Sequence, residues 1–149
     1  MIIRPIKQSD YNAWLPLWDG YNAFYGREGE TALAPSITQT TWQRFFDANE
    51  PMFALVAEID GQLVGLAHYL FHRRMITVES ICYLSDVFTL PTKRKTGIGR
   101  ALIEAVYAAA LAAGSKRVYW QTHESNSSGR SLYNKVAKHS GYIIYASDL

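Results

Sequence analysis

A short basic segment with two glycines, residues 91–100, has residue types suited to binding a phosphate group. It follows a strand-like run at 83–90 and leads into an Ala-rich helical pattern. The first turn of a helix has unpaired backbone N–H groups and a dipole that favours an anion. Glycine lets the backbone approach a phosphate closely, and arginine can bind two of its oxygens. The residues expected to bind the anion are Arg94, Lys95, Thr96, Gly97, Ile98, Gly99 and Arg100.

The pattern in this segment differs from two familiar nucleotide-binding turns. It lacks the Gly-Lys-Ser/Thr ending of a Walker turn, and Leu102 occupies the place of the third glycine in Gly-x-Gly-x-x-Gly. What remains is Arg-x-x-Gly-x-Gly, which a basic surface turn would explain equally well if it stood alone. The strand before it and the helix after it favour the phosphate-binding interpretation.

Length and composition predict one globular domain over residues 1–149. The chain is 48% hydrophobic and 19% charged, with a net charge of +2, so we expect a true core and no general nucleic-acid binding. No signal-peptide pattern or membrane-spanning run is visible, so we expect a cytoplasmic protein that binds no membrane. The single cysteine, Cys82, lies in an apolar run, and we expect it to be buried and structural.

The hydrophobic periodicity predicts alternating strands and helices around this segment. We expect strands at 2–7, 52–59, 62–73, 77–90, 116–122 and 142–145, and helices at 10–25, 36–46, 97–114 and 126–140. Pro16 and Gly20 predict a late start or a kink in the first helix. This order predicts an α/β sandwich, in which a mixed sheet has helices on both faces. The unit around 97–114 should be a parallel crossover with a ligand crevice at its strand ends.

Aromatic residues recur at three- and four-residue steps in the first predicted helix. Core packing explains most of this stripe, but part of it could line a cleft for an amine or ammonium group. The substrate-binding candidates are Trp18, Tyr21 and Tyr25. His68 and His72 are also four residues apart, but at that spacing they would lie far apart on a strand. No third ligand is evident, so we expect no metal site.

Two motifs together resemble the GNAT superfamily of N-acetyltransferases, and the element order is similar over the whole chain. Pro91-x-x-Arg94-x-x-Gly97-Ile98-Gly99-x-x-Leu102 resembles the family's coenzyme A pyrophosphate loop. Asn126-x-x-x-x-x-Leu132-Tyr133, followed by Gly141-Tyr142, resembles its second signature. Lys95 and Gly129 depart from the pattern, because many members have glycine and alanine there. The resemblance implies a mixed, mostly antiparallel, twisted sheet of about six or seven strands with helices on both faces.

The aromatic first helix and the runs 83–88 and 132–137 are similar to the branch of histone, polyamine and small-amine acetyltransferases. The resemblance implies that a primary amine attacks acetyl-CoA directly through a tetrahedral intermediate, without a metal. The acceptor would be a small amine, such as a polyamine or amino acid, or a protein lysine. Polyamine enzymes often carry an acidic pair where this chain has Ser85 and Asp86, so Ser85 argues against a direct polyamine assignment.

The resemblance also implies roles for individual residues. Backbone groups of Val87, Phe88 and Thr89 would bind the pantetheine arm as if it were an added strand. Residues 94–100 would bind the pyrophosphate, and Asn126 would contact the coenzyme arm. Tyr133 would protonate the leaving thiolate.

The general base is left open between two carboxylates. Asp86 would take the amine proton directly or through a water, or would instead bind the substrate cation or orient the loop. Glu79 is the second candidate, on the opposite face of a regular strand unless a bulge intervenes.

Two other function classes fit the same residues. One is a non-catalytic regulatory module that binds acyl-CoA, and the other is a nucleotide-binding domain that uses the same turn. The near-neutral charge argues against a strongly anionic groove for long histone tails. The apolar segment Tyr142–Tyr145 could pair across a dimer, so we expect a homodimer.

Overall fold

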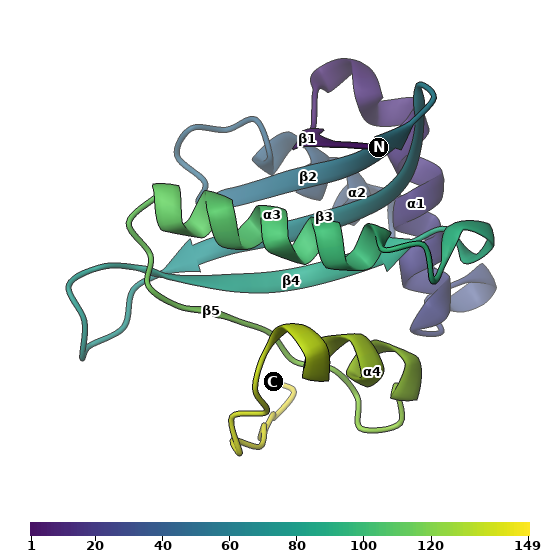
Figure 1. Cartoon of the computed structure of the whole chain (residues 1–149). Helices are drawn as coiled ribbons and strands as arrows, with labels where there is room; N and C mark the ends of the chain where they lie inside the picture. Colours follow the sequence, from purple (N-terminus) through teal and green to yellow (C-terminus); the bar gives the residue numbers. More distant parts are fainter.

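Five strands form one sheet in chain order in the computed structural model, which describes residues 1–149 (Figure 1). They are β1 (Ile2–Pro5), β2 (Met52–Ile59), β3 (Gln62–His72), β4 (Ile81–Thr89) and β5 (Val118–Tyr119). The pairs from β1 to β4 are antiparallel, whereas β5 is parallel to β4. The sheet is therefore mixed and mostly antiparallel, as predicted.

Helices cover both faces of this sheet, which confirms the predicted layers. The helices are α1 (Tyr11–Phe24), α2 (Pro35–Arg44), α3 (Ile98–Ala112) and α4 (Ser127–Val136). Helices α1 and α2 lie on one face and α3 on the other, while α4 lies beyond the β5 edge (Figure 1). Short 3-10 turns occupy 8–10, 29–31 and 91–93. None of the helices has the length and hydrophobicity that crossing a lipid bilayer requires.

The number of strands is lower than the six or seven predicted. Segment 142–145 forms no strand: its backbone pairs with no strand, and its apolar side chains are exposed rather than packed on the sheet. Other elements are shorter than predicted: β4 begins at Ile81 rather than at 77, and β5 has only two residues. Alternating sequence patterns extend past the point where a partner strand ends, so the patterns overestimate strand length.

Helix α1 is continuous through Pro16 and Gly20, so the predicted kink or late start is not observed. Gly20 has a packing role, because a Cβ atom there would lie 2.8 Å from the ring of Phe88. The absence of a side chain lets α1 pack directly on β4.

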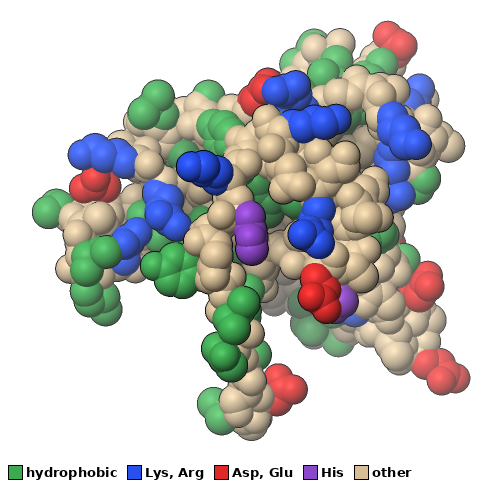
Figure 2. Space-filling view, turned by 60° about the horizontal axis from the view of Figure 1, so that its bottom comes forward, with side chains coloured by type: hydrophobic (Ala, Val, Ile, Leu, Met, Phe, Trp, Pro, Cys, Tyr) green, Lys and Arg blue, Asp and Glu red, His purple; other side chains and the backbone are tan.

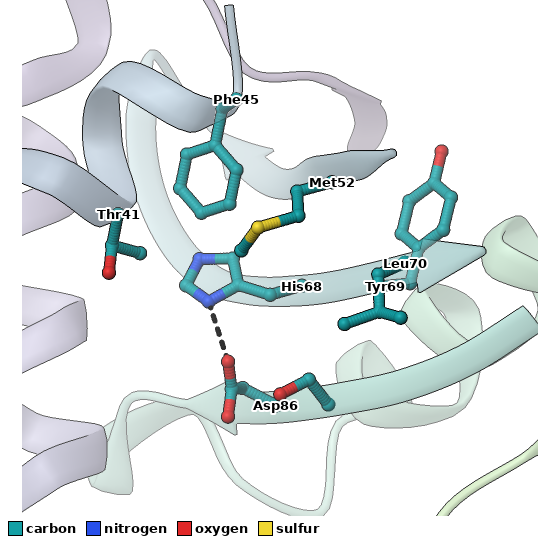
Figure 3. A pocket seen from close by; sticks show the side chains of 8 residues that line it. Thr41, Phe45, Met52, His68, Tyr69, Leu70 and Asp86 are labelled. Atoms are coloured by element: carbon teal, nitrogen blue, oxygen red, sulfur yellow. Dashed lines mark hydrogen bonds and ion pairs between the residues drawn. The ribbon is translucent and has the colours of Figure 1, made fainter. Parts of the chain in front are cut away.

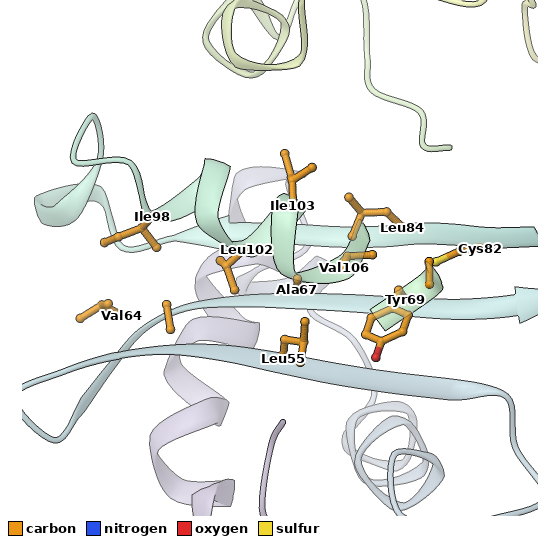
Figure 4. Packing of buried hydrophobic residues seen from close by; sticks show 12 residues of the cluster. Leu55, Val64, Ala67, Tyr69, Cys82, Leu84, Ile98, Leu102, Ile103 and Val106 are labelled. Atoms are coloured by element: carbon orange, nitrogen blue, oxygen red, sulfur yellow. The ribbon is translucent and has the colours of Figure 1, made fainter. Parts of the chain in front are cut away.

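Each face of the sheet buries its own apolar cluster. On the α3 face, Leu102, Ile103 and Val106 pack against residues of β2, β3 and β4 (Figure 4). On the α1 face, Trp14 and Leu17 pack against the other set of strand side chains. Burial on both faces specifies the strand register, because a slip of one residue would turn every side chain to the wrong face.

A β-bulge in β4 changes which face Asp86 occupies. Asp86 pairs with His68, but the next pair is Leu84 with Tyr69, so Ser85 has no partner on β3. In a regular strand Leu84 and Asp86 would share a face. With the bulge, Leu84 belongs to the α3-side core, whereas Asp86 meets His68 on the α1 side. The bulge thus brings a carboxylate to the aromatic helix without opening the core.

Arg4 connects β1 to the rest of the molecule through two carboxylates. Its guanidinium is 2.7 Å from Asp10 Oδ2 and 2.7 Å from Glu58 Oε2. The hydrogen bond from Arg4 holds the pKa of Asp10 below its ordinary value, although burial opposes this shift. Asp10 is therefore ionised at neutral pH, and its ion pair is lost only in acid.

Replacing Asp10 by Asn should destabilise the fold at neutral pH but not in acid. We expect Asp10→Asn to lower the free energy of unfolding at pH 7 by about 1–3 kcal/mol, since it removes a charged hydrogen-bond partner. The difference should shrink as the pH falls below about 4, where the wild-type carboxyl is also protonated. Urea unfolding at several pH values measures it, with the exposed Asp148→Asn as control. A loss of equal size at every pH would contradict the ionic explanation.

Candidate active site

Asp86 borders a small pocket on the α1 face of the sheet (Figure 3). The pocket is lined by Thr41, Phe45, Met52, His68, Tyr69, Leu70, Ser85 and Asp86. Its cavity volume is about 30 Å³. This is room for a water molecule or two but not for an acceptor molecule. An acceptor would therefore approach Asp86 from outside this pocket.

His68 holds Asp86 through a hydrogen bond whose direction is set by a tryptophan. His68 Nδ1 is 2.9 Å from Asp86 Oδ2, and the indole N–H of Trp14 donates to His68 Nε2 at 3.0 Å. Only 4% of His68 is exposed. Because an indole can only donate, Nε2 must be the unprotonated acceptor, and the ring proton is on Nδ1. Neutral His68 therefore donates to Asp86, and its own Nε2 is not free to act as a base.

The carboxylate of Asp86 is ionised although it is largely buried. Burial raises its pKa, but hydrogen bonds from His68, Tyr21 and Ser85 outweigh burial and hold the pKa below its ordinary value. About 15% of the side chain is exposed. A largely buried negative charge that is held by His68 and keeps some exposure can hold an ammonium group or accept a proton from it.

Sequence reasoning missed His68, which it weighed only as a metal ligand with His72. The structure directs the two histidines to different partners, because His72 Nε2 lies 2.7 Å from the hydroxyl of Tyr119. The signal in the sequence is the hairpin register that pairs His68 with Asp86. The sequence does not give this register, because the bulge at Ser85 shifts the pairing of β3 with β4 by one residue.

The predicted acceptor residues Trp18, Tyr21 and Tyr25 form a column of rings along α1. Successive ring centroids are 5.7 Å and 5.1 Å apart. Trp18 is buried and donates its indole N–H to Thr38, so it belongs to the core. Tyr21 is also buried, but its hydroxyl lies near Asp86, and Tyr25 is 41% exposed. Of the three predicted residues, only Tyr25 therefore has an accessible ring, while Tyr21 borders Asp86 from within the core.

Tyr133 lies on α4 against Trp120, with ring centroids 5.5 Å apart. Burial, and then the neighbouring hydroxyl of Tyr25, raise the pKa of Tyr133. The phenol therefore keeps its proton at neutral pH, as a general acid requires.

Val87, Phe88 and Thr89 lie along a free edge of β4. Strand β5 pairs with β4 only at Cys82 and Tyr83. Beyond Tyr83 the two strands separate, and the side of β4 that faces away from β3 has no neighbouring strand. Unpaired backbone groups at such an edge can bind an extended ligand in the manner of an added strand.

The glycine-containing turn has the backbone shape that an anion site needs. Gly97 has a φ of +88° and starts α3, and Lys95 has a φ of +62°. Lys95 thus occupies a left-handed position that glycine adopts more easily, which explains why a glycine suits this place. Ile98 is buried in the α3-side core and Thr96 donates to Lys93, so these two contribute structure and backbone groups.

The two arginines of the turn have different surroundings. Arg94 donates from Nε to the carbonyl oxygen of Thr89 at 3.3 Å, which joins the turn to the free edge of β4. Its guanidinium also lies over the rings of Phe24 and Phe88. Arg100 instead pairs with Glu104 at 2.9 Å and is exposed. Of the two arginines, Arg94 is therefore better placed to bind a ligand that lies along the free edge of β4.

Asn126 caps helix α4 with both ends of its amide. Its Oδ1 accepts from the N–H of Gly129 at 3.0 Å, and its Nδ2 donates to Thr122 at 2.9 Å. A Cβ atom at Gly129 would lie 2.5 Å from Asn126 Nδ2, which explains glycine at this position. Gly99 allows a second close approach, since its Cβ would lie 3.1 Å from Leu132. Asn126 thus positions α4 beside the start of α3.

Glu79, the alternative base, does not lie at this site. It precedes β4, and its carboxylate is 3.1 Å from Lys116 Nζ. Glu79 precedes Asp86 by seven residues, and seven residues of extended chain span about 23 Å, so the two carboxylates lie far apart. No group of three His, Cys, Asp or Glu side chains is arranged to hold a metal ion.

Comparison with known proteins identifies the family. Residues 14–137 match the acetyltransferase (GNAT) family. The chain belongs to this family. It is 33% identical to the D-amino-acid N-acetyltransferase HPA3 of Saccharomyces cerevisiae over 97% of this chain and 89% of that protein. It is 29% identical to the uncharacterized N-acetyltransferase YhfO of Bacillus subtilis over 97% of this chain and 95% of that protein.

Solved structures of GNAT-like enzymes share the fold. An aminoglycoside acetyltransferase, AAC(6')-Iy, in complex with a CoA-containing bisubstrate analogue superposes with a TM-score of 0.84 at 16% identity, covering 99% of this chain and 97% of that one. AAC(6')-IG from Acinetobacter haemolyticus superposes with a TM-score of 0.79 at 16% identity, covering 100% and 99%. At this identity the likeness concerns the fold.

The predicted family and activity are confirmed: the protein is an acetyl-CoA-dependent N-acetyltransferase. Its residues fit the coenzyme. The free edge of β4, the hydrogen bond from Arg94 to Thr89 and the α3 N-terminus form a continuous set of backbone donors and positive charge. Such a set suits an extended arm that ends in a pyrophosphate.

The tautomer of His68 can be tested directly. In protein labelled with ¹⁵N at histidine, we expect the His68 proton on Nδ1 and an unprotonated Nε2, because Trp14 can only donate. Trp14→Phe removes that donor, so the variant should lose the fixed tautomer. Nitrogen–proton correlation spectra measure both states. A proton on Nε2 in the unmodified protein would contradict the assigned direction of the hydrogen bonds.

The turn should depend on backbone shape at Gly97 more than on the side chain of Lys95. Alanine disfavours the left-handed conformation of Gly97 by about 1–2 kcal/mol, so in Gly97→Ala the free turn should relax to another shape. Coenzyme binding must then restore the strained shape, and we expect acetyl-CoA to bind roughly 5- to 30-fold more weakly. A Cβ at Gly97 contacts nothing within 4 Å, so no clash confuses the result. Lys95→Gly keeps the backbone N–H and should bind within about 3-fold of the parent. Titration calorimetry measures both, and a large loss in Lys95→Gly would instead assign the side chain to phosphate binding.

Proposed function

We propose that this acetyltransferase acts on the primary amine of a small molecule, with the amine bound at Asp86. The observation that carries the proposal is the ionised carboxylate of Asp86, held by neutral His68 beside the free edge of β4. A fixed negative charge next to the place for a thioester suits an amine that arrives as an ammonium and must lose a proton before it attacks.

The coenzyme side of the site would be built mainly from backbone. We propose that Val87, Phe88 and Thr89 bind the pantetheine arm and that Arg94, with the backbone of 95–100, binds the pyrophosphate. The exposed side chains of Lys95 and Arg100 would add positive charge. Asn126 would act by capping α4, because both ends of its amide are already bonded within the protein.

In the proposed reaction Asp86 takes a proton from the amine, directly or through a water in the adjoining pocket. The amine nitrogen then bonds to the thioester carbonyl carbon, whose oxygen becomes an oxyanion stabilised by a backbone N–H of the β4 edge. The carbon–sulfur bond breaks, the nitrogen loses its second proton to solvent, and the thiolate receives the proton of Tyr133. One acetyl group thus moves from sulfur to nitrogen with net release of one proton, because Asp86 returns its proton to solvent and Tyr133 takes one back.

Several observations favour a small acceptor over a basic protein tail. The face shown in Figure 2 carries several Lys and Arg side chains and no continuous acidic groove for a lysine-rich peptide. Ser85 replaces the second acid that a polyamine site would use. The relative HPA3 is described as a D-amino-acid N-acetyltransferase, which supports an amino acid acceptor for this chain. A homodimer through residues 142–145 stays a prediction.

Removing either reacting side chain should abolish most turnover. We expect Asp86→Asn and Tyr133→Phe each to lower kcat/KM by roughly 10²- to 10⁴-fold, since each removes a proton-transfer group. Release of free coenzyme A thiol measures this with amino acids, polyamines, aminoglycosides and a lysine-rich peptide as acceptors. Matched controls that should keep full activity are Asp19→Asn, at an exposed position of α1, and Tyr11→Phe, at the start of α1, where the ring packs against Trp42.

Different results of this screen separate the alternatives. If the parent releases thiol only with the lysine-rich peptide, the proposed small acceptor is wrong. If the parent is active and neither variant loses rate, the roles of Asp86 and Tyr133 are wrong.

A further inference from the structure

Arg27 has a guanidinium that is mostly unpaired although it is only half exposed. It follows α1, and its Nε donates to the side-chain oxygen of Asn22 at 2.7 Å. No acidic side chain lies within ion-pair distance of it, and no acceptor in the protein receives a hydrogen bond from Nη1 or Nη2. Four N–H groups in a planar fork are therefore free to bind a ligand.

The orientation of this fork is held from several sides. Asn22 is buried and donates its own amide N–H to the carbonyl oxygen of Trp18 at 2.9 Å. The backbone N–H of Arg27 donates to the carbonyl oxygen of Asn22 at 2.9 Å. The guanidinium carbon lies 5.8 Å from the ring centroid of Tyr21 and 5.3 Å from that of Tyr25. Such an arginine loses little freedom when it binds a planar anion.

Tyr21 connects this arginine to the proposed amine site. Its ring faces the Arg27 guanidinium, and its hydroxyl lies near enough to Asp86 for each group to influence the pKa of the other. Arg27 and Asp86 themselves form no ion pair. A positive group therefore lies by the ring of Tyr21 and a negative group near its hydroxyl, and neither neutralises the other. This arrangement complements a ligand with an ammonium and a carboxylate close together.

We propose that Arg27 binds the carboxylate of an α-amino acid acceptor whose amino group lies at Asp86. The inference rests on the proposed function and names the acceptor class of that same site. In an α-amino acid the amino group and the carboxylate are bonded to the same carbon. One small molecule can therefore meet both charges. The arginine fork matches the two carboxylate oxygens. A polyamine would instead bring a second positive charge toward Arg27, which like-charge repulsion disfavours.

The test compares acceptors that differ only in the carboxylate. D- and L-phenylalanine, their amides, and the polyamine spermidine are assayed with the parent, Arg27→Gln, Arg27→Lys and the control Arg74→Gln. Arg74 lies in the loop between β3 and β4 and forms no ion pair. The quantity measured is the ratio of kcat/KM for the acid to kcat/KM for its amide, in which general effects on folding or coenzyme binding cancel.

We expect the parent to prefer the acid and Arg27→Gln to lose about 10- to 100-fold of that preference, as for a lost charged hydrogen bond. Arg27→Lys should fall between the two, because a lysine keeps the charge without the fork. Arg74→Gln should keep the ratio of the parent.

Two results would overturn the inference. One is a parent that acetylates phenylalanine amide as well as phenylalanine. The other is an unchanged acid-to-amide ratio in both Arg27→Gln and Arg27→Lys. Either result leaves the proposed function standing as long as some amine releases thiol, whereas no release with any amine refutes the proposed function itself.

Discussion

The hydrogen bond from His68 to Asp86 is the interaction on which the site depends. An ionised carboxylate on a largely buried face costs several kcal/mol unless donors surround it. His68 can supply the main donor only because Trp14 binds its other nitrogen and fixes the proton on Nδ1. The bulge at Ser85 then makes the contact possible, since it turns Asp86 to the α1 face while Leu84 stays in the core. The charge of Asp86, the tautomer of His68 and the bulge in β4 therefore depend on one another.

The two halves of the proposed site use different kinds of groups. On the coenzyme side, the open edge of β4, the turn at Gly97 and the start of α3 offer mostly backbone donors. Backbone donors bind phosphate and amide groups shared by every acyl-CoA, so they tolerate much sequence change. On the acceptor side, the proposed groups are side chains, namely Asp86 on β4 and those of α1 and the loop after it. These side chains lie where differences between related enzymes can alter the acceptor without altering the coenzyme.

The aromatic helix has a mechanical role as well as a chemical one. Stacked rings from Trp14 through Trp18 to Tyr21 leave little freedom for any of them to move. The same stack buries the indole of Trp14 against His68 and holds the Tyr21 hydroxyl near Asp86. Rigid placement of opposite charges at fixed separation is what lets a small site distinguish a zwitterion from a diamine.

The sequence by itself determined the order of helices and strands, the turn at 94–100 and the family, because these depend on contiguous residues and local backbone preference. It also placed Asp86 and Tyr133 on the correct elements. Only the tertiary structure decided the partner of Asp86, the loss of a strand at 142–145, the cap role of Asn126 and the setting of Arg27. Each of these depends on which residues from distant segments meet, and the register between strands, shifted here by one unpaired residue at Ser85, is not encoded in any single stretch.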